Sequence, residues 1–229
     1  MKYHSVLFDL GSTLVYSPAD KTYPYVLNAF GAQKDPEEIK RAFYLADKTF
    51  MREYPHVLGT NPECFMPWFL GIVNYYLDIR LNLEETFRSY QRVCRNMNLG
   101  WLPVPGAIDL LKELRQRGVH TGLISNWDSS CRSVLKKNGL DSLLDTVVIS
   151  SEVGVEKPDS RIFETALRMT DFAPEQTLFV GDNYYDDVIG GSTCGIRCLL
   201  LTPFEKLGIE EIDYSSTLHT ISEVMNYLE

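Results

Sequence analysis

The sequence SVLFDLGSTL at residues 5–14 joins a short apolar run to an aspartate, Asp9, and then to small and polar residues. An apolar run of this length that ends at turn-forming residues is typical of a buried β-strand. In open α/β sheets, ligands bind beyond the carboxyl ends of the strands. The stretch therefore predicts a buried strand whose aspartate stands where a ligand can bind.

Further apolar runs along the chain have the same character. They are rich in Val, Ile and Leu without strict alternation, as expected for parallel strands covered on both faces. Helical patterns separate the later runs, at 106–117, 129–138, 160–170 and 186–194. This alternation predicts an α/β fold with a doubly wound, Rossmann-like parallel sheet. The predicted strands are 4–9, 119–125, 146–150, 177–181 and 197–201.

The first crossover is much longer than the others. Residues 10–118 separate the first two predicted strands, far more than one crossover helix needs. Between residue 16 and about residue 100 the sequence has helical patterns and no convincing strand. We predict an α/β core at 1–15 and 101–229, and a helical cap domain at 16–100 over the carboxyl edge of the sheet. The predicted cap helices lie near 21–30, 36–53, 63–79 and 84–97.

The predicted cap carries many aromatic residues. They could line a substrate pocket, but aromatic side chains more often fill a core, and we expect that role for most of them. The residues concerned are Phe50, Tyr54, Phe65, Trp68, Phe69, Tyr75 and Tyr76.

Composition limits the possible partners and the location. The net charge of −9 leaves no basic stripe to neutralise phosphates, so no nucleic-acid partner is expected. The chain has 5 cysteines and no CxxC pair, which favours reduced thiols in a cytoplasmic protein. No apolar run is long enough to cross a membrane, and Met1–His4 lead straight into the first strand, so neither membrane span nor signal peptide is expected. The oligomeric state is not predicted.

Three further segments carry polar residues at predicted strand ends or crossovers. Ser125 and Asn126 end the second strand run and can donate hydrogen bonds to an anion. Lys157, in GVEKPD, offers a compact positive charge before a predicted helix. Asp182 and Asp187 follow the fourth strand run and offer the carboxylate oxygens that Mg²⁺ prefers.

In this order, the four segments resemble the four motifs of the haloacid dehalogenase (HAD)-like hydrolase superfamily, whose first motif is usually DxDGT. The position of the helical insert resembles the C1-type cap of subfamily I, as in phosphoglycolate phosphatases and 2-haloacid dehalogenases. The resemblance implies a Mg²⁺-dependent hydrolase of small phosphorylated metabolites that forms an aspartyl-phosphate. It implies catalytic roles for Asp9 and Lys157, substrate-binding roles for Thr13, Ser125 and Asn126, and metal ligation by Asp9, Asp182, Asp187 and the main-chain carbonyl of Gly11.

The first motif departs from the family pattern at one catalytic position. Gly11 stands where most phosphatases of the family carry a second aspartate, which protonates the leaving oxygen and later activates water. General acid–base catalysis contributes roughly 10²–10⁴-fold, so ordinary phosphomonoesters should react slowly. Substrates with good leaving groups should be less affected. A water molecule, Tyr16, Tyr23 or His56 could replace the missing group.

Gly11 also leaves alternatives open. The 2-haloacid dehalogenases lack the second aspartate too and carry a Ser-Asn pair like Ser125-Asn126, but they dispense with the metal-binding acids. Asp182 and Asp187 are retained here, which favours phosphate chemistry. Phosphonatase-type members use a cap lysine, and no cap lysine here has a recognisable setting. A non-catalytic HAD-fold protein that binds a phosphorylated ligand or a partner is the remaining alternative.

Overall fold

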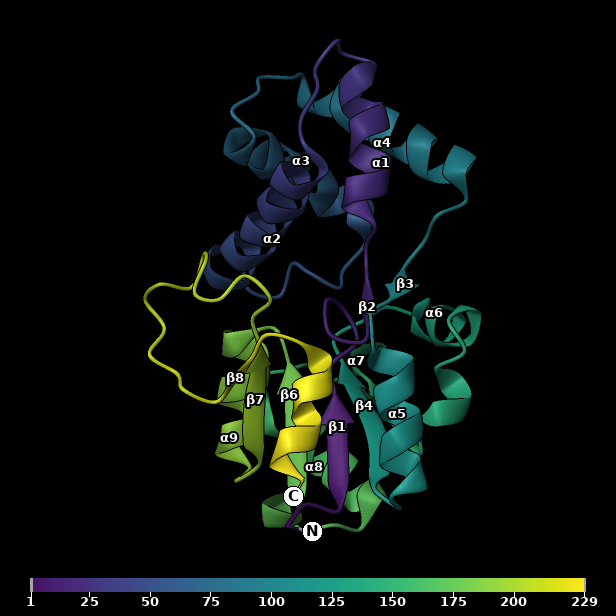
Figure 1. The fold of residues 1–229 in the computed structure, drawn as a ribbon, viewed down its shortest axis with the longest axis vertical. Coiled ribbons are helices and arrows are strands. Elements are labelled where there is room, and N and C mark those ends of the chain that lie inside the picture. The colour runs from purple at the N-terminus through teal and green to yellow at the C-terminus, as the bar shows by residue number, and fades with distance from the viewer. Residues whose placement is uncertain (1, 229) are drawn as a thin grey trace. The chain divides into compact units, whose positions relative to one another are not determined.

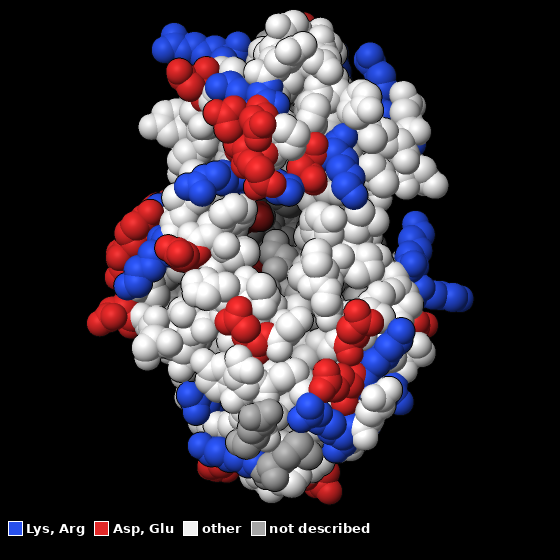
Figure 2. Space-filling view, viewed as in Figure 1, with Lys and Arg blue, Asp and Glu red and all other residues white. Residues whose placement is uncertain are grey.

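The computed structural model describes residues 2–228 and divides into two compact units (Figure 1). The α/β unit consists of the stretch that ends at Tyr16, Pro103–Glu205 and the stretch from Ile212 onward. The helical unit consists of Ser17–Leu102 and Lys206–Glu211. No helix between residues 2 and 228 has both the length and the hydrophobicity that a bilayer span requires. Acidic and basic side chains are interspersed over the face seen in Figure 2.

The α/β unit is built on a six-stranded parallel sheet with the order β5-β4-β1-β6-β7-β8. The strand that carries the SVLF run, β1, lies in the middle of the sheet between β4 and β6. All five predicted strands are confirmed, and β8 is an addition of only two residues. The strands are β1 Ser5–Phe8, β4 His120–Ser125, β5 Thr146–Ile149, β6 Thr177–Gly181, β7 Arg197–Leu201 and β8 Thr217–Leu218.

Helices cover both faces of this sheet, which confirms the predicted doubly wound α/β class. Phe8 of β1 shares a buried cluster with Leu111 of α5, while Phe179 of β6 meets Phe163 of α8 edge to face on the other side. The α-helices are α5 Ala107–Gln116, α6 Cys131–Lys137, α7 Ser150–Val153, α8 Ser160–Thr170 and α9 Ile189–Thr193. A π-helical turn spans Tyr184–Val188, and 3₁₀ turns span Asp141–Leu143, Pro174–Gln176 and Ile221–Tyr227.

The helical unit contains the four helices that the sequence predicts. They are α1 Ala19–Asn28, α2 Pro36–Glu53, α3 Pro62–Tyr76 and α4 Leu83–Met97. Asp35 caps α2 in a capping box with Glu38, and the side chains of Asn61 and Asn82 cap α3 and α4. These caps satisfy main-chain N–H groups that a helix start leaves without an internal partner, so they fix where each helix begins.

The aromatic residues of the helical unit divide into two groups. Phe50, Phe65 and Phe69 lie in its core, as expected. The expectation that most of the seven pack inside is nevertheless wrong, because Tyr54, Trp68, Tyr75 and Tyr76 are exposed.

Two features near the ends of the insert were not predicted. Strands β2 Val15–Tyr16 and β3 Leu102–Pro103 pair in a small separate sheet where the chain leaves and re-enters the α/β unit. Residues 206–211, which the prediction placed in the α/β core, belong to the helical unit. Arg52 of α2 donates a hydrogen bond to the carbonyl of Gly208 at 3.1 Å and contributes to this attachment.

Candidate active site

The sheet register brings the chemistry-bearing residues to one edge. Phe8 of β1 lies opposite Leu123 of β4 and Val180 of β6, so the carboxyl ends of the three strands are level. Asp9 follows directly, and its main-chain N–H donates to the carbonyl of Val180 at 2.8 Å. On the neighbouring strands, Ser125 lies two residues beyond Leu123, and Asp182 lies two residues beyond Val180. Three side chains that are far apart in sequence therefore meet at the sheet edge.

Three buried carboxylates form the centre of the site. One oxygen from each of Asp9, Asp182 and Asp187 lies within 4.8 Å of the others. Negative charges this close repel strongly away from water unless a cation lies among them. Their oxygens are the ligands that Mg²⁺ prefers, and magnesium sites often use only one or two carboxylates beside substrate and water. The donor set therefore fits a hard divalent cation.

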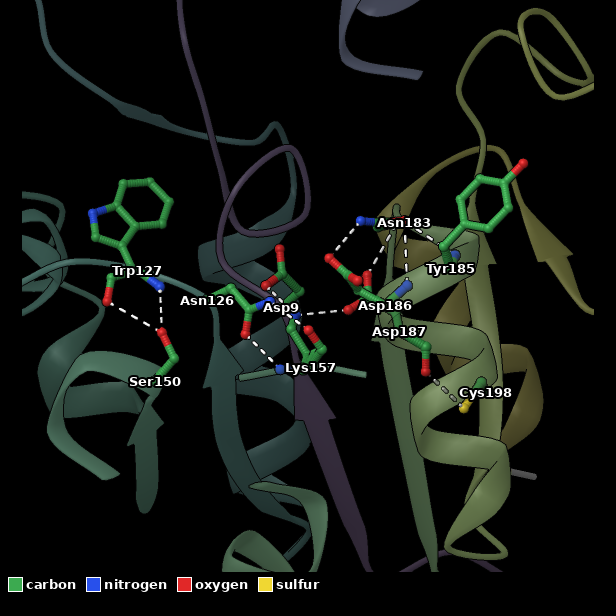
Figure 3. Close-up of polar contacts among 10 residues, drawn as sticks. All are labelled: Asp9, Asn126, Trp127, Ser150, Lys157, Asn183, Tyr185, Asp186, Asp187 and Cys198. Carbon is green, nitrogen blue, oxygen red and sulfur yellow. Dashed lines mark hydrogen bonds and ion pairs between the residues drawn. The ribbon is translucent and has the colours of Figure 1, made fainter. Parts of the chain in front are cut away.

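Lys157 is the protein's own positive charge in this cluster (Figure 3). Its Nζ lies 2.6 Å from Oδ1 of Asp9 and 2.6 Å from Oδ1 of Asp187, and the side chain is almost fully buried. The ammonium also lies over the ring of Phe179, at 5.5 Å from its centroid. These contacts hold the amine against the carboxylate that follows β1.

The charges in this cluster shift one another's pKa values. The pKa of Asp9 is raised to about 7, chiefly by burial; Lys157 opposes this rise, and the charges of Asp187 and Asp182 add to it. Burial by itself would lower the pKa of Lys157, but Asp187 and Asp9 together raise it above the ordinary value. Lys157 thus stays charged at neutral pH.

Asn126 bonds to the main chain of Lys157 through both ends of its side-chain amide. Its Oδ1 accepts the main-chain N–H of Lys157 at 2.8 Å, and its Nδ2 donates to the carbonyl of the same residue at 2.9 Å. The amide thereby clamps the main chain of Lys157 to the end of β4. These two bonds give Asn126 a role in positioning Lys157, and its predicted contact with substrate stays a prediction.

Asp187 is also held by the protein. While Oδ1 faces Lys157, Oδ2 accepts the main-chain N–H of Asn183 at 3.0 Å. Asn183 in turn caps the π-helical turn, since its Oδ1 accepts from the N–H groups of Tyr185 and Asp186 (Figure 3). Sequence reasoning missed Asn183, although an asparagine directly before an acidic turn is a common cap. With both oxygens engaged, Asp187 is better placed to support a cation than to be its main ligand.

Two hydroxyl-bearing residues that the sequence predicted for substrate binding are buried. Thr13 Oγ1 and Ser125 Oγ have no hydrogen-bond partner among the residues that the structure describes, and both side chains are buried. Buried polar groups are nearly always satisfied, so these two hydroxyls are free to bond a ligand. Both can donate to the oxygens of an anion.

The candidates for the missing acid are dispersed. Tyr23 is buried in the helical unit, where its hydroxyl donates to Asn74 at 2.6 Å and burial raises its pKa, so it is not available for proton transfer. Tyr16 ends β2, and His56 is an exposed residue of the helical unit. Gly11 forms a bridge to Val15 in the loop after β1. The proposed ligand role of its carbonyl stays a prediction.

One glycine at this edge is required for packing. A Cβ on Gly181 would lie 2.1 Å from Oδ2 and 2.4 Å from Cγ of Asp187. Gly181→Ala should therefore displace Asp187 from Lys157 and lower metal affinity and turnover by roughly 10–100-fold, the usual cost of losing support around a metal site. Thermal shift with and without Mg²⁺ and steady-state kinetics measure this effect. Gly100→Ala is the control, since a Cβ there meets nothing within 4 Å; equal behaviour of the two variants would contradict the prediction.

Comparison with known proteins identifies the class. The model of the haloacid dehalogenase-like hydrolase family matches residues 3–195, and the chain belongs to this family of hydrolases. Haloacid dehalogenase-like hydrolase domain-containing protein 3 of Mus musculus is 36% identical over 208 residues, covering 87% of this chain and 82% of the relative. Glyceraldehyde 3-phosphate phosphatase of Methanothermobacter thermautotrophicus is 35% identical over 204 residues, covering 86% and 74%. The magnesium-bound HAD-hydrolase YfnB of Bacillus subtilis shares the fold over the full length of both chains, at 18% identity and a TM-score of 0.68.

Proposed function

We propose that this hydrolase is a Mg²⁺-dependent phosphatase of small phosphorylated metabolites, with Asp9 as its nucleophile. The observation that carries the proposal is the buried cluster of Asp9, Asp182 and Asp187, in which Lys157 pairs with Asp9 and Asp187. A haloacid dehalogenase reaction has no need of this cation site, whereas phosphoryl transfer uses one. The related glyceraldehyde 3-phosphate phosphatase supports a small phosphorylated substrate.

Each residue of the site has its own role in the proposed reaction. An oxygen of Asp9 attacks phosphorus, and the bond from phosphorus to the leaving oxygen breaks. Lys157 and the hydroxyls of Ser125 and Thr13 stabilise the negative oxygens of the transferring group. Mg²⁺, held by Asp9 and Asp182 with Asp187 in support, supplies further charge neutralisation when bound. Water then cleaves the aspartyl-phosphate and restores Asp9.

Metal removal tests this proposal. The purified protein should release phosphate from acetyl phosphate and from para-nitrophenyl phosphate with Mg²⁺, and EDTA should lower the rate at least about 10²-fold because the cation stabilises charge in the transition state. Phosphate release is measured directly, and readdition of Mg²⁺ is the control. Halide release from 2-chloropropionate in EDTA would favour the dehalogenase instead. No turnover of any substrate would favour a ligand-binding protein.

The proposed location is the cytoplasm. All five cysteines are free thiols, with Cys131 and Cys198 buried, which supports a reducing and hence cytoplasmic setting.

A further inference from the structure

The ring of Trp127 lies where a side chain at position 11 would project. A Cβ on Gly11 would come within 3.3 Å of Cζ3 on the indole, closer than most Cβ contacts. Trp127 follows Ser125 and Asn126 beyond the end of β4 and is half-buried. The six-membered ring of the indole therefore lies where the side chain of the family's second aspartate would begin at position 11.

The protein holds this ring in place without a ligand. The indole Nε1–H donates to Ser130 Oγ at 3.0 Å, and the main-chain N–H of Trp127 donates to Ser150 Oγ at 3.1 Å. Asp128 accepts the N–H of Ser130 at 2.8 Å and so fixes the first of these partners. Figure 3 shows the ring projecting beyond the strand ends, as does the carboxylate of Asp9. A ring anchored at both the side chain and the main chain is a preorganised surface.

The chemistry of an aromatic edge differs from that of a carboxyl group. Carbon-bound hydrogens of the indole neither protonate an oxygen nor accept a proton from water. A leaving oxygen beside this edge receives no proton from it and departs with its electron pair. An alcohol would then leave as an alkoxide, a strong base, whereas a carboxylic acid with a pKa near about 4 leaves readily as a carboxylate.

We propose that Trp127 is a specificity-determining residue that, together with Gly11, selects acyl phosphates as substrates. This inference rests on the phosphatase function proposed above. The Asp9 oxygen forms a bond to phosphorus, and the bond between phosphorus and the acyl oxygen breaks, leaving its electron pair on a carboxylate. In the second step a water oxygen bonds to phosphorus, the bond to Asp9 breaks, and the protons of the water pass to the phosphate product and to solvent.

The test compares acetyl phosphate with ethyl phosphate, which differ in the carbonyl of the leaving group. In the wild type only acetyl phosphate should turn over appreciably. Gly11→Asp should raise kcat/KM for ethyl phosphate by no more than about 10-fold, because the ring obstructs the new side chain. Gly11→Asp combined with Trp127→Leu should raise it by roughly 10²–10⁴-fold, the usual contribution of an acid–base group. Leucine keeps an apolar contact, and thermal unfolding confirms that each variant is folded.

Two results would overturn this inference. The first is a wild type that hydrolyses both substrates equally well, and the second is a full gain from Gly11→Asp alone. Failure of the phosphatase proposal looks different, since neither substrate would then yield phosphate in any variant.

A second readout does not depend on turnover. The chain has 3 tryptophans, and Trp68 and Trp101 lie in the helical unit. With both replaced by phenylalanine and Asp9 retained, acetonylphosphonate, a non-hydrolysable analogue of acetyl phosphate, should change the emission of Trp127 in the presence of Mg²⁺. An unchanged emission at saturating acetonylphosphonate would refute the contact between the ring and the substrate.

Discussion

Asp9→Asn should abolish phosphate release, with a loss of at least about 10⁴-fold, because an amide cannot attack phosphorus and nucleophile deletions cost this much or more. The substitution has nearly the same shape as the original side chain. It also leaves Lys157 its second partner, Asp187, at 2.6 Å. The fold should therefore survive. Steady-state kinetics and thermal unfolding of the same preparation measure both effects.

The matched control changes an aspartate away from the sheet edge. Asp171 is exposed and ends α8 with a φ of 59°, a conformation that asparagine tolerates well. Asp171→Asn should keep wild-type turnover. An Asp9→Asn variant that retains a tenth or more of the activity would show that another group attacks the substrate, and the proposed mechanism would be wrong.

The same variant tests the electrostatics of the site. Burial raises the pKa of Asp9 to about 7, above the ordinary value of 3.8. The folded protein therefore loses stability as the pH rises through this interval, since the buried carboxylate must ionise. Asp9→Asn removes that cost and should be at least as stable as the wild type at pH values above about 7 in EDTA.

Mg²⁺ requires the charged carboxylate, so the Mg²⁺ affinity of the wild type should rise between about pH 6 and 8. Isothermal calorimetry measures this Mg²⁺ affinity, and an affinity that does not change between about pH 6 and 8 would contradict the raised pKa of Asp9.

The arrangement of the sheet edge was predictable because it depends on regular structure. Apolar runs located β1, β4 and β6, and parallel strands in register place their carboxyl ends side by side. Any residue just after such a run must then lie near its counterparts. This reasoning predicted that Asp9 and Asp182 converge, and the structure places them in one cluster.

The contacts made by loops were not predictable in this way. Asn126 faces the main chain of Lys157 only because the loop after β4 meets the loop before α8, and no periodicity encodes that encounter. The approach of Trp127 to Gly11 has the same origin. Strand β8 has only two residues, which is too short for an apolar pattern to be recognised in the sequence. Local sequence specifies elements, whereas these contacts depend on how the loops pack.

Lys157→Met should destabilise the protein by about 3–5 kcal/mol at pH 8 in EDTA, because it leaves buried carboxylates without their cationic partner. Lys157 is almost fully buried and touches Asp9 and Asp187. Turnover should also fall by roughly 10²–10³-fold, the usual effect of losing one group that stabilises the transition state. Urea unfolding and steady-state kinetics measure the two losses. The exposed Lys137→Met variant is the control and should match the wild type.

The cause of this destabilisation can be separated from simple loss of packing. If unpaired negative charge is responsible, loss of Lys157 raises the pKa of Asp9, because Lys157 lowers that pKa in the wild type. The destabilisation must then shrink as the pH falls toward about 5 and Asp9 takes up a proton. Replacing Asp187 by asparagine in the Lys157→Met background should then recover stability, whereas the same replacement in the wild type should lower it. Such opposite signs at one position arise only from coupled charges. Additive losses at every pH would show that the destabilisation does not come from lost charge pairing, and would contradict the charge-paired site proposed here.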